Sequence, residues 1–251
     1  MASKAPSPNQ LRLRIARELE EFATILVNEG ICTDSSPFSH GSNQCRSYSG
    51  NKWGYSISGV TLRVGQDVQC TPSSVSTFDC RLDVEVEGLT RAPAPQADPL
   101  EKHQVEIELK APNEADPAMS YLQTWHLDRH LGSCGDPKPA HPRYHLSFGG
   151  YRLEAHLKAV GTFGGLLLLD SPRLTHPPLD GVLAVDFVLS NFAGTKWRTL
   201  SESPVYRRIV TNSQTLLWKP YALALYAHWS TDAASKKVWP IAELWPQLFL
   251  S

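Results

Sequence analysis

The sequence predicts an α+β protein with the core order α-β-β-β-α-β, an antiparallel meander of strands, and a largely helical C-terminal part. Three observations predict this class: an amphipathic stretch near the N-terminus, three alternating strand-like runs in the middle, and a strongly apolar helical segment after residue 178. Hydrophobic residues make up 41% of the 251-residue chain, which is enough to bury a core.

The N-terminal segment is predicted to form a helix over residues 10 to 29, which ends at Gly30. Its apolar stripe repeats at helical spacing and comprises Leu11, Ile15, Leu19, Phe22 and Leu26. Glu18 falls inside this stripe, either as a long side chain that reaches solvent or as a functional carboxylate. Residues 31 to 54 show no sustained period and are predicted to be a long loop.

Three runs of alternating residues predict strands at 55 to 64, 78 to 87 and 103 to 110. One side of each run is aliphatic. The other side is polar and holds Thr61, Arg63, Asp83, Glu85, Glu87, Glu106, Glu108 and Lys110. Like charges on neighbouring strands destabilise a sheet, so this acidic face needs a cation to offset it.

Asp116 and Pro117 have the residue types of a helix start and predict a helix through Leu131. Strands are expected at 144 to 148 and 165 to 169, then helices at 179 to 192, 203 to 212 and 213 to 229. Asp186, within the apolar helix, needs a partner such as an arginine or a tryptophan indole.

Composition sets broad limits on function. No apolar run is long enough to cross a bilayer, and five cysteines without a Cys-x-x-Cys pair suggest reduced thiols, so a cytoplasmic location without membrane association is expected. Residues 1 to 142 carry 13 Lys and Arg against 18 Asp and Glu, whereas 143 to 251 carry 11 against 7. This weak basic bias leaves nucleic-acid binding open.

Two short strings on the predicted strands carry the functional hypothesis. Leu82-Asp83-Val84 places one acid on the second strand, and Glu108-Leu109-Lys110 places an acid and a lysine on the same side of the third. Two carboxylates from adjacent strands can hold Mg²⁺, which prefers oxygen ligands, and a nearby ammonium can orient a water molecule or stabilise charge on a phosphate.

Over residues 10 to 150 this arrangement resembles the PD-(D/E)xK nuclease family, the restriction-endonuclease-like fold. Residues 1 to 150 are predicted to form the nuclease-like core and 151 to 251 a C-terminal region packed on it, with one single domain as the alternative. The resemblance implies Mg²⁺- or Mn²⁺-dependent hydrolysis of DNA or RNA, a setting in bacterial antiviral defence, and Asp83 and Glu108 as metal ligands with Lys110 as the orienting cation. It also implies that Gln123 or Tyr121 fills the family's position on the following helix, and that Glu18 matches the first-helix acid of some members. Asp79 competes with Asp83 for the same role.

Several alternatives stay open. The polar face could be an ordinary solvated face, or the chain could be a non-catalytic subunit that docks a protein partner or a second copy through its C-terminal helices, where five of the seven tryptophans lie. Glu106-x-Glu108-x-Lys110 also resembles the string of triphosphate-tunnel hydrolases, with residues 151 to 158 as a further alternating segment. A zinc site could be drawn from His126, His130, Cys134, His141 and His145.

Overall fold

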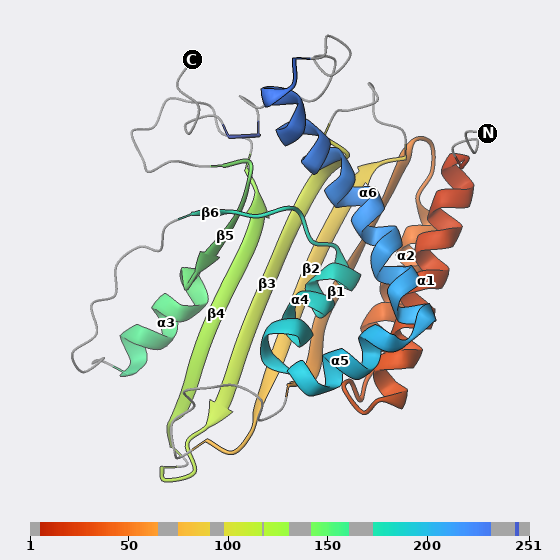
Figure 1. Ribbon diagram of the computed structural model, residues 1–251. Coiled ribbons are helices and arrows are strands. Elements are labelled where there is room, and N and C mark those ends of the chain that lie inside the picture. Colours follow the sequence, from red (N-terminus) through yellow and green to blue (C-terminus); the bar gives the residue numbers. More distant parts are fainter. Residues whose placement is uncertain are drawn as a thin grey trace.

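A six-stranded antiparallel sheet forms the centre of the protein in the computed structural model, which describes residues 6–64, 75–90, 98–116, 118–130, 142–160, 173–231 and 244–245. Each strand pairs with its neighbour in sequence, so the sheet is a meander (Figure 1). The strands are β1 (Lys52–Val64), β2 (Phe78–Leu89), β3 (Leu100–Pro112), β4 (Ser120–Arg129), β5 (Tyr144–Phe148) and β6 (Leu174–Thr175). The α+β class and the three predicted central strands are confirmed.

One face of the sheet is covered by helices, because the alternating aliphatic residues of β1 to β3 need a partner layer. The helices of this layer share one hydrophobic core with the sheet and are α1 (Pro8–Asn28), α4 (Gly181–Phe192), α5 (Gly194–Glu202) and α6 (Pro204–Trp229). The predicted N-terminal and apolar helices are confirmed. The two helices expected over 203 to 229 form one continuous helix with Pro220 inside it.

The prediction of a loop over residues 31 to 54 is wrong, because α2 (Ser36–Ser47) occupies most of this segment. Its buried stripe is made of Phe38, Gly41, Ser42 and Cys45, and three small side chains give little hydrophobic signal. The side-chain oxygen of Gln44 accepts a 2.6 Å hydrogen bond from the Ser56 N–H. Helix α2 therefore covers the outer edge of β1, which would otherwise expose unpaired backbone groups.

The helix predicted over residues 116 to 131 is also wrong, since Ser120–Arg129 is strand β4, paired with β3 at nine positions. Asp116 does accept a backbone hydrogen bond as a capping residue would, from the Ala118 N–H at 3.1 Å. That bond closes the β3–β4 hairpin turn instead of starting a helix, because the chain has a long partner strand to pair with.

A short helix, α3 (Gly150–Val160), follows β5 and lies beside β4, away from the other helices (Figure 1). The alternating residues 151 to 158 suggested a strand, but they form a helix. The resemblance to triphosphate-tunnel hydrolases therefore lacks the further strand that it needs. The strand expected at 165 to 169 lies outside the described residues. Among the described helices, none has both the length and the apolarity needed to span a membrane.

Candidate functional site on the polar face of the sheet

The acidic residues of β2 and β3 stand on the sheet face opposite the main helical layer. In the strand register, Asp83 pairs with Glu106, Arg81 with Glu108, and Asp79 with Lys110. Paired residues of an antiparallel sheet point to the same side, and every second residue of a strand does so too. Asp83, Glu108 and Lys110 therefore share one face, as the sequence predicted.

The guanidinium of Arg152, from α3, joins these acids. Its Nη2 lies 2.7 Å from Asp83 Oδ2, and its Nη1 lies 3.4 Å from Glu108 Oε2. Its Nε lies 4.0 Å from Glu106 Oε2. Three carboxylates from two strands thus surround the Arg152 guanidinium, and each of the four side chains is less than a quarter exposed.

A backbone irregularity in β1 fixes the Asp83 carboxylate. The register of β1 against β2 shifts between Ile57 and Val60, where Gly59 adopts a φ of 73°. This left-handed conformation favours glycine. It directs the Gly59 N–H to Asp83 Oδ1 at 2.6 Å. Asp83 is consequently held from two sides, by a backbone donor and by Arg152.

The pKa values of two of these acids shift in opposite directions. Burial alone would raise the pKa of Asp83, but the hydrogen bonds from Arg152 and Gly59 and the charge of Arg81 outweigh it and hold that pKa below the usual value. Burial raises the pKa of Glu106, and the weaker opposing effects of Gln104, His126 and Arg152 do not cancel it. The face therefore combines a firmly ionised carboxylate with one that protonates more readily.

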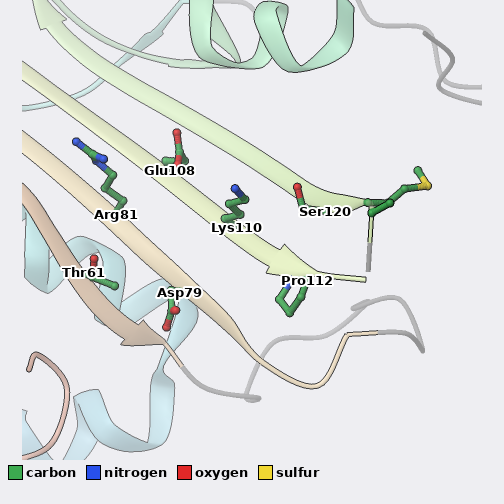
Figure 2. A pocket seen from close by; sticks show the side chains of 9 residues that line it. Thr61, Asp79, Arg81, Glu108, Lys110, Pro112 and Ser120 are labelled. Carbon is green, nitrogen blue, oxygen red and sulfur yellow. The ribbon is translucent and has the colours of Figure 1, made fainter. Parts of the chain in front are cut away.

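Lys110 lies farther along β3, in an open depression of about 610 Å³. Figure 2 shows Lys110, Glu108 and Arg81 standing on the same side of the strands, with Asp79 nearby. Lys110 is exposed, and no hydrogen bond or ion pair joins its ammonium to another described residue. A second depression of about 330 Å³, lined by Asp83, Glu106 and Arg152 among others, lies beside the first. The Arg152 guanidinium lines this second depression, and its partner Glu108 lines the first.

Two of the five predicted catalytic residues are not brought to this face. Gln123 lies on β4, not on a helix, and it pairs with Leu109, which places it on the helix-covered face. Glu18 lies in the helical layer, where its Oε1 accepts a 2.5 Å hydrogen bond from Asn212 and lies 3.5 Å from Arg208. Burial raises the Glu18 pKa, and the Asn212 hydrogen bond only partly offsets this effect. Glu18 is therefore a paired structural carboxylate, remote from Asp83.

Sequence reasoning missed Arg152. The only signal pointing to it was the excess of acids on one sheet face, which required a cation without locating one. The tertiary position of α3, which no local pattern encodes, supplies that cation.

Two of the five histidine-group residues do come together. His126 on β4 and His145 on β5 lie near each other with Asp128 as the third member, and one possible ligand atom from each lies within 4.8 Å of the others. His130 is not in this group, and Cys134 and His141 lie outside the described residues. Comparisons of the chain with family models, curated proteins and solved structures find no match.

Proposed function

We propose that the protein is a metal-dependent hydrolase of phosphodiester bonds in DNA or RNA, with its site on the polar sheet face. One observation carries the proposal: the carboxylates of Asp83 and Glu108, from adjacent strands, converge on one cation, the Arg152 guanidinium. Two converging carboxylates are a suitable oxygen donor set for Mg²⁺ or Mn²⁺. The Arg152 guanidinium occupies a position where the carboxylates stabilise positive charge, which is the position proposed for the metal ion.

Asp83 and Glu108 would hold the metal ion, and a bound divalent ion would supply Lewis-acid activation of water and of the scissile phosphate. Lys110 would bind a non-bridging phosphate oxygen, because its ammonium is exposed in the depression next to Glu108. Arg152 would exchange its carboxylate partners for the incoming phosphate, since a guanidinium binds both groups with the same bidentate geometry. Arg81, exposed on the same side, would add a contact to the nucleic-acid backbone.

A cytoplasmic setting belongs to this proposal. Cys32, Cys45 and Cys80 are free and buried. Thiols of this kind persist in a reducing compartment, which supports the location.

A cleavage assay tests the proposal with matched controls from the same strands. Purified protein is incubated with single- and double-stranded DNA and RNA in Mg²⁺, in Mn²⁺ or with chelator. We expect metal-dependent cleavage that falls about 100-fold or more in Lys110→Ala and in Asp83→Asn, because each removes a group from the reacting centre. Lys102→Ala and Glu85→Gln change a partly exposed charge of the same sheet face and should keep wild-type activity.

Two results would overturn the proposal. One is the absence of cleavage of all four substrates in both metals by folded wild-type protein. The other is cleavage that is unchanged in Lys110→Ala and Asp83→Asn, which would point to a contaminating nuclease.

A non-catalytic role in a homo-oligomer or a protein complex is the second candidate. The observation that favours it is the exposure of Tyr226 and Trp229 on α6, at 63% and 64%. Other tryptophans of this region are structural, since the Trp197 indole donates to Asp186 and the Trp218 indole donates to the Pro178 carbonyl. Sedimentation of wild type and of the Tyr226→Ser/Trp229→Ser variant separates the cases. If both wild type and the variant sediment as monomers at every concentration, the homo-oligomer is excluded.

A further inference from the structure

We infer that His126, Asp128 and His145 form a binding site for a divalent transition-metal ion, with Zn²⁺ as the representative ion. This site is separate from the Asp83–Glu108 pair and does not depend on the proposed function. His126 and Asp128 are two residues apart on β4 and so share a face. His145 is the direct register partner of Asp128 on β5. The sheet itself therefore gathers the three ligand atoms within 4.8 Å of one another.

The orientation of His145 is the strongest argument for a cation. This side chain is only 2% exposed, its Nδ1 lies 3.1 Å from the Pro142 carbonyl oxygen, and its Nε2 lies 2.9 Å from Asp128 Oδ1. A carbonyl oxygen can only accept, so Nδ1 carries a hydrogen in this contact. Nε2 faces a carboxylate oxygen, which also only accepts, so this contact calls for a cation: a proton on Nε2 or a metal ion bound to both atoms.

The same orientation is typical of a metal-binding histidine, in which one ring nitrogen donates to a backbone carbonyl and the other binds the ion. Pro142 is well placed to orient the ring, because it lies two residues before the first residue of β5. The His145 ring is thus buried and oriented before any ion binds.

His126 supplies the second nitrogen. Its ring centroid lies 6.2 Å from that of His145, and the two rings are nearly perpendicular at 80°. Among the described residues this group offers two imidazoles and one carboxylate, the number of protein ligands found in catalytic zinc sites and other mononuclear transition-metal centres. This donor set differs from the all-oxygen pair of Asp83 and Glu108, which suits Mg²⁺ or Mn²⁺.

Glu106 lies between the two cation positions. It pairs with His126 across the β3–β4 ladder, and its carboxylate lies 4.0 Å from Arg152 on the other side. One carboxylate of β3 therefore lies next to both His126 and the Arg152 guanidinium.

The test is metal binding by chelator-treated protein, followed through the visible absorption of Co²⁺, displacement of Co²⁺ by Zn²⁺, and calorimetry. We expect one tightly bound Co²⁺ or Zn²⁺ per chain with nitrogen and oxygen ligation, since the all-oxygen Asp83–Glu108 pair suits Mg²⁺ or Mn²⁺ instead. His126→Ala and Asp128→Asn should each weaken binding by about 100-fold or more, because even loss of an outer-shell partner costs ~10- to 100-fold. These two partly exposed positions carry the test, since replacing buried His145 could unfold β5.

Two controls keep the result specific. His40→Asn removes an exposed histidine on α2 and should leave the affinity unchanged. Asp83→Asn should also leave it unchanged, which separates this site from the proposed nuclease site. Absence of Co²⁺ binding, sulfur-ligated Co²⁺ spectra, or wild-type affinity in both His126→Ala and Asp128→Asn would overturn the inference. Each result would leave the His145–Asp128 contact as a histidine–carboxylate pair that binds no metal ion.

Discussion

Replacing Arg152 by alanine should destabilise the protein and create a binding site for a divalent cation. The variant leaves the carboxylates of Asp83, Glu106 and Glu108 facing one another without their shared positive charge. Breaking a fully buried ion pair costs about 3–5 kcal/mol, and an exposed pair is worth less than about 1 kcal/mol. With the Arg152 and Asp83 side chains each 20% exposed, we expect a loss near ~2 kcal/mol, or about 4–8 °C in Tm for a chain of this size.

The stability difference between wild type and Arg152→Ala should also depend on pH. The folded-state pKa of Asp83 lies below its ordinary value, so its pairing contributes stability above the unfolded pKa, and this contribution is lost as pH falls through the folded pKa. Arg152→Ala removes the largest of the effects that lower this pKa and keeps those of Gly59 and Arg81. The stability difference between wild type and variant should therefore be largest at neutral pH and close as the pH falls below about 4.

Mn²⁺ should stabilise Arg152→Ala more than wild type, because the ion can occupy the place that the guanidinium leaves. Thermal unfolding followed by circular dichroism, with and without Mn²⁺, measures this difference. Arg81→Ala is the matched control, since Arg81 lies 3.4 Å from Asp83 but is 54% exposed and should matter by less than about 1 kcal/mol. If Arg152→Ala unfolds at the wild-type temperature and responds to Mn²⁺ no more than wild type does, the carboxylates do not converge on a cation position.

Three further predictions concern stability and are measured by urea titration. Burial lowers the pKa of His103 to about 4, so the contribution of its neutral form to stability is complete above about pH 6.5. About 3 kcal/mol of this contribution is lost as the pH falls to 4. The difference in free energy of unfolding between wild type and His103→Gln should shrink by the same amount. Gly181→Ala should cost about 2 kcal/mol, because a Cβ there would come 2.5 Å from a β1 side chain. Asp98→Ala should cost about 3 kcal/mol, because it leaves the Arg129 and Arg143 side chains, only 9% and 14% exposed, without their carboxylate. An unchanged midpoint for Gly181→Ala or Asp98→Ala would contradict the packing described.

Alternation alone was enough to predict the polar face. Val105, Ile107 and Leu109 must face the core, and this requirement puts Glu106, Glu108 and Lys110 on the opposite side, as the structure confirms. The placement of Glu18 and Gln123 could not be predicted in the same way. It depends on which face α1 covers and on the register of β4, and both follow from contacts between distant segments.

For Asp186, the sequence of one helix predicted the need for a partner but not which residue the partner would be. Its position in an apolar helix predicted a partner, and an indole was one of the expected kinds. The structure supplies Trp197 Nε1 and the Tyr206 hydroxyl, each 2.8 Å from the carboxylate. The need for a partner was predictable from chemistry, whereas the choice of Trp197 over a nearby arginine required the packing of α5 and α6 against α4.

The wrong prediction of a helix over residues 116 to 131 also changed which metal ligands were expected to lie together. As a helix, this segment would put His126 and His130 on one face and turn Asp128 away from them. As strand β4, it puts Asp128 beside His126, while His130 lies about 13 Å farther along the chain, at ~3.3 Å per residue. The spacing of apolar residues fits both periods, and only pairing with β3 and β5 decides between them. A two-histidine, one-aspartate site therefore arises from a strand register, and a search for helical metal motifs could not have found it.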